Sequence, residues 1–186
     1  MPTDRPIGVP EARDGLLWVP PNLWGSVPHS STSWTLGRTA AGDYKLSRTS
    51  AGAETHYLFA ALPGVCRRTD ATGIKPLAVI LAYNVGVADA TTITPAVNRA
   101  VYVDRVAVAV AAFGGVLVYD ANHDTNAKRI SSTSGNNPHV LLATLGAEQY
   151  QDSDSGLVTI ELTVVIPNTS VFTLLGGGFR VAHNTY

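Results

Sequence analysis

The sequence predicts an all-β protein, built as a β-sandwich or a barrel. In several segments after about residue 54, apolar side chains alternate with polar or small ones, which is the period-two pattern of a strand with one buried face. β-Branched residues and tyrosine, which strands favour, dominate these segments. The predicted strands are 54–61, 76–87, 97–110, 115–120, 138–145, 157–166 and 170–182.

Residues 1–53 have a different composition from the rest of the chain. They contain six of the eleven prolines and all three tryptophans. Proline fixes φ and removes a backbone donor, so long helices and central strands are not expected here. We therefore divide the chain into an extended Pro/Trp-rich arm (1–53) and a sandwich domain (54–186). The arm packs either on its own domain or on a neighbouring subunit, and its expected interface anchors are Trp18, Trp24 and Trp34.

The segment 76–87 shows the strand pattern most fully. Its odd-numbered side chains, from Leu77 to Val87, are large and apolar and are predicted to face the core. The even-numbered side chains are mostly small, and small residues let another layer approach closely.

Residues 96–112 are the one segment with a serious helical alternative. Alanine favours a helix, but the segment also contains six valines, which lose side-chain freedom in a helix. We therefore predict a strand.

The two last predicted strands are strongly apolar and are joined by the turn-forming residues 167–170. This arrangement predicts a C-terminal hairpin, with Val158, Ile160, Leu162, Val164 and Ile166 on an inward face. The glycines 176–178 interrupt the last strand. Glycine inside a strand predicts a bulge or a close backbone approach.

Composition excludes several classes of protein. The net charge is −1, with 15% charged residues, which does not suit binding to a nucleic-acid backbone. Apolar runs are too short for a membrane span, and the N-terminal residues do not resemble a secretory signal. Cys66 is the single cysteine, so no internal disulfide forms, as fits assembly in a cytoplasm. Low charge together with 45% apolar residues predicts an oligomer that covers apolar surface.

One loop is a candidate ligand site. Oxygen-bearing side chains alternate along residues 120–126, as in calcium loops. The sixth position is Thr125 rather than glycine and the twelfth is Ser131 rather than glutamate, so the helical calcium-hand motif fails. The alternative is a solvated loop, and the same holds for a second acidic loop at 151–156. The candidate oxygen ligands are Asp120, Asn122, Asp124 and Asn126.

No combination of residues predicts catalysis. The histidines show no paired metal-ligand spacing, and there is no G-x-S-x-G elbow or phosphate-binding loop. Cys66 lacks a placed partner, and Asn168-Thr169-Ser170 is interpreted as a turn rather than a glycosylation site. The sequence predicts no catalytic residues, no metal and no cofactor. The five histidines are His29, His56, His123, His139 and His183.

Gly73-Ile74-Lys75 opens one predicted strand, Asn98-Arg99 lies in another, and Thr159-Ile160-Glu161 lies in the last apolar pair. With these residues, the segment 55–182 resembles the jelly-roll structural proteins of tailed-bacteriophage virions. The resemblance lies in a strand opening, an Asn-Arg strand and the last apolar pair of strands, and does not include 1–53 or 112–137. It implies a jelly-roll-like sandwich that forms a homotrimer in a virion. The matching residues are Gly73, Ile74, Lys75, Asn98, Arg99, Thr159, Ile160, Glu161, Thr163, Val164, Thr169, Ser170, Val171 and Leu174.

The function expected from this resemblance is structural. The first hypothesis is a capsid decoration (cement) protein that binds the major capsid protein or other virion proteins, with the arm 1–53 providing most of the attachment. The second is a tail, collar, fibre-base or spike protein. A carbohydrate-binding β-sandwich is the third, and a hydrolase is the least supported. No nucleic acid or membrane partner is expected.

Overall fold

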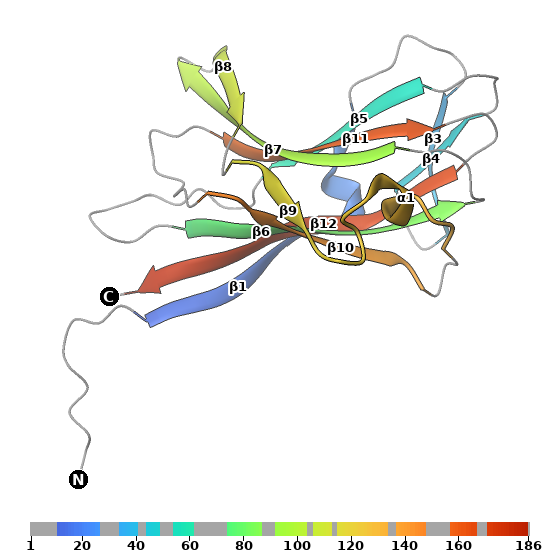
Figure 1. Ribbon diagram of the computed structural model, residues 1–186. Coiled ribbons are helices and arrows are strands. Elements are labelled where there is room, and N and C mark those ends of the chain that lie inside the picture. Colours follow the sequence, from blue (N-terminus) through green and yellow to red (C-terminus); the bar gives the residue numbers. More distant parts are fainter. Residues whose placement is uncertain are drawn as a thin grey trace.

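The computed structural model has two layers of antiparallel β-sheet that pack face to face (Figure 1). Within the described part of the chain, the helices are a 3-10 turn, η1 (Pro21–Leu23), and one short helix, α1 (Asn126–Arg129). The all-β prediction is confirmed. The structure describes residues 11–26, 34–40, 44–48, 54–61, 74–86, 92–103, 106–112, 115–133, 137–147, 157–166 and 171–185.

The larger sheet, called sheet A, contains seven strands among these residues. Six of them follow one another in hydrogen-bonded order, and β1 pairs with the part of β12 that β4 leaves free. In that order the six are β3 (Trp34–Arg38), β4 (Tyr44–Arg48), β12 (Val171–Thr185), β6 (Ile74–Gly86), β10 (His139–Leu145) and β9 (Leu117–Tyr119); β1 is Glu11–Val19.

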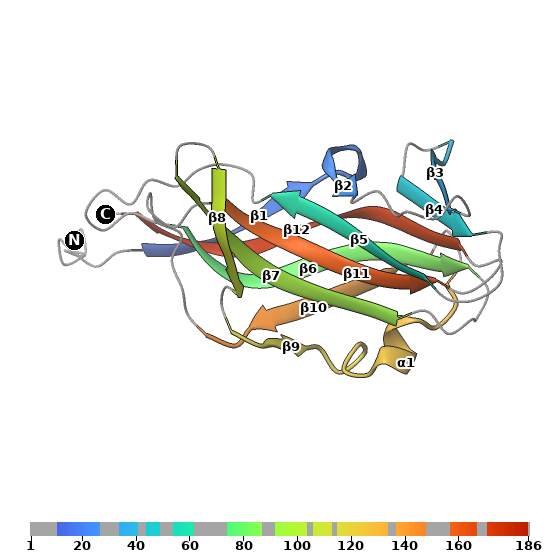
Figure 2. The same cartoon turned by 90° about the horizontal axis from the view of Figure 1, so that it is seen from above.

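The smaller sheet, called sheet B, covers the inner face of sheet A (Figure 2). Its central strand, β11, pairs with β5 on one side and with β7 on the other. In order, the described strands are β2 (Gly25–Ser26), β5 (Glu54–Ala61), β11 (Leu157–Ile166), β7 (Thr92–Val103) and β8 (Val106–Ala112).

The core lies between the sheets and follows the predicted alternation. On β11, four of the five predicted inward residues are fully buried, and the described side chains between them are half-buried. The side chain of the fifth, Ile166, lies outside the described part. Large side chains of sheet A face them, including Leu81, Phe172 and Phe179. Burial of each such side chain contributes roughly 1.5–3 kcal/mol relative to exposure.

The predicted alternation of β6 fails at one point. Leu77, which was predicted to face the core, is only half-buried. The register with β12 shifts here, because Arg180 is opposite Ala78 and Val181 is opposite Pro76. Leu77 is the extra residue of a β-bulge, so Pro76 lies opposite the buried Val181. Ala78 keeps the predicted outer face, opposite the exposed Thr144 and Arg180, and is buried there. Val87, predicted on the same face, lies outside the described residues.

The predicted C-terminal hairpin is wrong. β11 is the central strand of sheet B, whereas β12 lies in sheet A between β6 on one side and β1 and β4 on the other. The joint 167–170 lies outside the described residues. An apolar inward face and a polar joint fit a passage between two sheets as well as a hairpin, because both strands then face the same core from opposite sides.

The strand prediction for residues 96–112 is confirmed, with one change. The segment forms two strands, β7 and β8, which pair with each other from Asn98↔Ala112 to Val103↔Val106. The predicted single strand is therefore a hairpin.

The described part of residues 1–53 does not form an arm outside the sandwich. β1 pairs with β12 along its whole length, from Glu11↔Thr185 to Val19↔Gly177, and β2, β3 and β4 also belong to the two sheets. The prolines do not prevent this, because Pro10 precedes β1 and Pro20 and Pro21 follow it. The predicted boundary at residue 53 therefore does not separate these strands from the sandwich.

Two of the three glycines of β12, Gly176 and Gly177, make room for tryptophan rings on opposite faces of sheet A. Gly176 has φ +134° and lies in a register shift, and an added Cβ there would be 2.6 Å from Cζ2 of Trp18. At Gly177 an added Cβ would be 2.9 Å from Cζ2 of Trp24, on the core side. The prediction of a bulge or close approach is confirmed, and the close approach is to β1 and η1.

We expect Gly176→Ala to lower the free energy of unfolding by about 1–3 kcal/mol, because the new methyl group meets the Trp18 ring in a backbone conformation that favours glycine. Gly37→Ala is the control, since a Cβ added there would have nothing within 4 Å. Urea denaturation of both variants measures the difference. Equal stability of the two would contradict the packing of Trp18 on β12.

Candidate functional site

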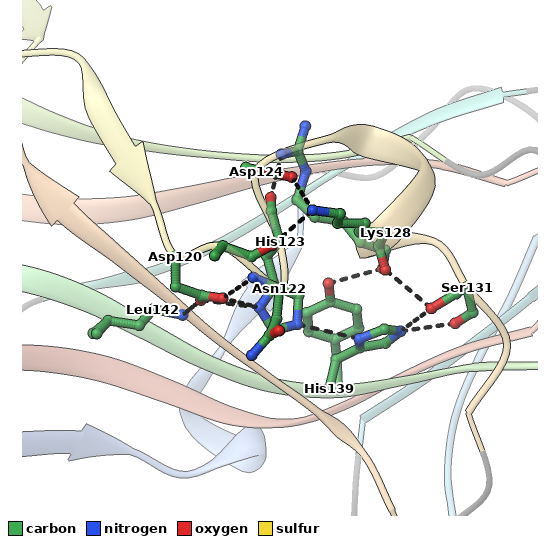
Figure 3. A network of polar contacts seen from close by, with 11 residues as sticks. Asp120, Asn122, His123, Asp124, Lys128, Ser131, His139 and Leu142 are labelled. Carbon is green, nitrogen blue, oxygen red and sulfur yellow. Dashed lines mark hydrogen bonds and ion pairs between the residues drawn. The ribbon is translucent and has the colours of Figure 1, made fainter.

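The loop between β9 and β10 contains the candidate oxygen ligands and a network of buried polar groups (Figure 3). Asp120 organises this loop. Its Oδ1 accepts a hydrogen bond from the Asn122 backbone N–H at 2.8 Å, and its Oδ2 accepts one from the Leu142 N–H at 2.9 Å. Both carboxylate oxygens are 2.9 Å from Nδ1 of His123.

These bonds keep Asp120 ionised. Burial by itself raises the pKa of this carboxyl group, but the hydrogen bonds from Leu142, His123 and Asn122 together outweigh burial and lower the pKa below its ordinary value. The carboxylate is therefore a fixed negative charge that ties β10 to the loop.

The four predicted oxygen ligands do not present a common site. Asp124 forms an ion pair with Lys128 at 2.8 Å, while Asp120 faces His123 and Leu142. Thr125 caps α1, where its Oγ1 accepts from the Lys128 N–H. The two carboxylates thus serve different donors, as Figure 3 shows, and the interpretation as an oxygen-ligand loop is not supported.

Two histidines meet beside Asp120. Nε2 of His123 is 3.2 Å from Nδ1 of His139, and the rings are nearly perpendicular, with 70° between their planes. Nε2 of His139 lies 2.7 Å from the carbonyl oxygen of Ser131 and 3.4 Å from its Oγ. Both histidines are buried, with 6% and 9% of their surface exposed.

Tyr83 and Arg129 hold the histidine pair in place. The ring of Tyr83 stacks on His139 with 5.0 Å between centroids, and its hydroxyl donates to the Arg129 carbonyl at 2.9 Å. Nη1 of Arg129 donates to the His123 carbonyl at 2.7 Å, and the guanidinium lies 4.4 Å from the centre of the Tyr119 ring. These contacts fix the backbone on both sides of His123.

Burial controls the protonation of this cluster. It raises the pKa of the Tyr83 hydroxyl far above its ordinary value, despite the opposing charge of Arg129. Burial also lowers the pKa of His139; the hydrogen bond to the Ser131 carbonyl opposes this, and the nearby His123 adds to it. Tyr83 is therefore a neutral donor, and His139 favours its neutral form.

The arrangement does not form a nucleophile–base pair. Oγ of Ser131 donates to the Lys128 carbonyl at 3.0 Å, and the nearby nitrogen of His139 is closer to the Ser131 carbonyl than to this hydroxyl. Within the described ranges, no group of three or more His, Cys, Asp or Glu side chains could hold a metal ion. A shallow hollow of about 590 Å³ opens over the histidines; it is lined by Ala121, Asn122, His123, Ala127, Lys128, Ser131 and His139.

Sequence reasoning did not single out His139. Its position carried a usable signal, because His139 alternates in phase with the buried residues Leu141, Ala143 and Leu145 of β10. A histidine on the inward face of a strand needs a buried hydrogen-bond partner. The partner could not be located from sequence, because His123 is sixteen residues away.

The predicted interface anchors have different environments. Trp24 is a core residue, 5% exposed, whose Nε1 donates to the Val19 carbonyl at 3.2 Å. Its predicted role as an anchor on another subunit is wrong for this fold, because the ring is covered by its own domain. Trp18 is 39% exposed on the outer face of sheet A. Trp34 lies in β3, and its side chain is outside the described part.

The outer face of sheet A carries apolar side chains on several strands, with the exposed Thr144 and Arg180 on the same face. Trp18, Ile80 and Leu142 belong to one row of the sheet, through the pairs with Gly178 and with each other. Val140, opposite Ala82, and Val118, opposite Thr144, extend this surface, and they are 58% and 61% exposed. We call this surface the outer face of sheet A; it comprises Leu16, Trp18, Ile80, Ala82, Val118, Val140 and Leu142.

Comparisons with protein-family models and with curated proteins found no match for this chain. In the described segments, no helix has both the length and the apolar character that crossing a membrane requires.

Proposed function

We propose that this protein is a non-enzymatic structural component of a bacteriophage virion, with a jelly-roll-like strand arrangement, which assembles as a homotrimer and decorates the capsid. The observation that carries the proposal is the exposed outer face of sheet A. Large exposed apolar patches mark surfaces that bind other proteins, and the low charge of the chain favours burial of such a patch.

The residues that resemble virion proteins are compatible with this role. On β7, Asn98 is the backbone partner of Thr159, and Arg99 is the partner of the inward Val158. Thr159, Glu161 and Thr163 are half-buried on the face of β11 that points away from the core. These side chains shape the surface of sheet B and carry no chemistry of their own. Such a protein can bind copies of itself through the outer face of sheet A and leave sheet B available to the shell.

We expect light scattering to give three times the chain mass of 19.6 kDa at micromolar concentration. The double variant Val118→Lys/Val140→Lys should dissociate to monomers, because assembly would bury the two new lysine charges in the interface without partners. Leu23→Lys is the matched control, since Leu23 is 66% exposed in η1, away from this face. A monomeric wild-type protein would contradict the proposal.

Copy number distinguishes the capsid from other parts of a virion. In purified particles that carry the protein, its band intensity relative to the major capsid protein should correspond to hundreds of copies. A few dozen copies or fewer would assign it instead to a tail, collar, fibre base or spike. Absence from the particles would exclude a virion role altogether.

A further inference from the structure

The two buried histidines have their hydrogen positions fixed from outside the pair. Nδ1 of His123 faces the Asp120 carboxylate, and Nε2 of His139 faces the Ser131 carbonyl oxygen. Both partners only accept hydrogen bonds, so each of these ring nitrogens carries the proton of its ring. In the neutral rings, the remaining nitrogens, Nε2 of His123 and Nδ1 of His139, then present lone pairs to each other.

Two facing lone pairs at 3.2 Å repel unless a cation lies between or beside them. The cation is either a shared proton or a metal ion. The distance suits a metal ion, because tetrahedral Zn–N bonds of about 2.0–2.1 Å place two ligand nitrogens roughly 3.3 Å apart. It is also at the long end of the range for a hydrogen bond with a nitrogen donor.

The groups behind the histidines are those that metal-binding histidines use. A ligating histidine commonly donates its second N–H to a carboxylate or a backbone carbonyl, which fixes the tautomer and the ring orientation. Asp120 provides the carboxylate for His123, and Ser131 provides the carbonyl for His139. Buried ring N–H groups need acceptors in any case, and these two acceptors also decide which nitrogen of each ring faces the other histidine.

We propose that His123 and His139 bind a divalent transition-metal ion through Nε2 and Nδ1, with water from the adjoining hollow as the remaining ligands. Imidazole nitrogen favours Zn²⁺, Ni²⁺ and Cu²⁺ over Mg²⁺ and Ca²⁺. The hollow reaches both histidines, so the ion has an entry path. The ammonium of Lys128 bonds the Ala121 carbonyl and the Asp124 carboxylate, which directs its charge toward these oxygens.

The ion would stabilise the fold by linking two segments of the chain. His123 belongs to the loop between β9 and β10, and His139 begins β10. An ion held by both joins the loop to the sheet and is bound by the folded state alone, so it raises the melting temperature as its concentration rises. This role is independent of the virion proposal.

Isothermal titration of the full-length protein with ZnCl₂ tests the site. We expect one Zn²⁺ per chain, and we expect His123→Gln and His139→Gln each to weaken binding at least about tenfold. Asp120→Asn, which changes a positioning residue, should weaken binding about 10–100-fold while both ligand nitrogens remain. MgCl₂ in excess should not compete.

The other histidines provide the control. His29→Gln, His56→Gln and His183→Gln should leave the affinity unchanged, and loss of binding in these variants alone would overturn the proposal. Should the ligand variants not fold, ¹⁵N-histidine NMR of the wild type decides: Zn²⁺ is expected to shift Nε2 of one ring and Nδ1 of another. Ring signals that Zn²⁺ leaves unchanged, with one ring doubly protonated, would show that a proton occupies the gap and would overturn the metal site.

Discussion

Replacing Trp24 with alanine is expected to lower the free energy of unfolding by about 3–5 kcal/mol. The indole is 5% exposed and belongs to the core cluster between the sheets. Its ring lies against Gly177, and its Nε1 donates to the Val19 carbonyl. Removal of the ring would leave a large cavity where η1 covers β12. Gly177, which borders this cavity, has no side chain that could fill it.

Trp18→Ala is the matched control for this change. Trp18 also packs on a glycine of β12, but it is 39% exposed on the outer face of sheet A. Trp18→Ala should therefore lower the free energy of unfolding by well under half as much as Trp24→Ala. Urea denaturation at neutral pH measures both. If the two variants lose equal stability, or if Trp24→Ala only changes self-association, Trp24 is an interface anchor and its core placement is wrong.

Replacing Asp120 with alanine is expected to cost roughly 2–4 kcal/mol, because it removes the charged acceptor of the Leu142 and Asn122 N–H groups and of His123. Asp124→Ala is the control. Its carboxylate pairs with Lys128, but both side chains are about half exposed, at 49% and 48%, so the loss should be at most about 1 kcal/mol. Similar losses for the two variants would contradict the structural role of Asp120.

The contribution of Asp120 should also depend on pH. Its pKa is lower in the folded state than its ordinary value, so its stabilising effect is fully present above the unfolded-state pKa and is lost as the pH falls through the folded-state pKa. The stability difference between wild type and Asp120→Ala should therefore shrink in acid. A difference that grows as the pH falls would show that the carboxyl group is not held in its ionised form.

After residue 53, local sequence identified the strand segments, and on β11 it also identified the buried face; β1 to β4 were not predicted as strands. The alternation of apolar and polar residues in β11 is a local property of the chain, and it matches the burial of Val158, Ile160, Leu162 and Val164. The glycines of β12 likewise predicted a close backbone approach. Such signals survive folding because a strand has the same two-residue period in any sheet.

Only the tertiary structure decided which strands are neighbours. The apolar faces of β11 and β12 are equally compatible with a hairpin in one sheet and with two facing sheets, and the fold uses the second. The Pro- and Trp-rich segment shows the same limit. Pro10, Pro20 and Pro21 mark the ends of β1, but its partner, β12, lies at the other end of the chain, and local composition carries no information about a partner so distant.

The residues that form the polar cluster were even harder to predict from sequence. Sequence pattern pointed to the segment 120–126 and to oxygen ligands, whereas the fold uses Asp120 to orient His123 and brings His139 to it from β10. Spacing rules detect ligands that share one helix or one loop. His123 and His139 meet because the 120–133 loop returns to the first residue of the next strand, and that return is decided by the packing of Tyr83 and Arg129 beneath it.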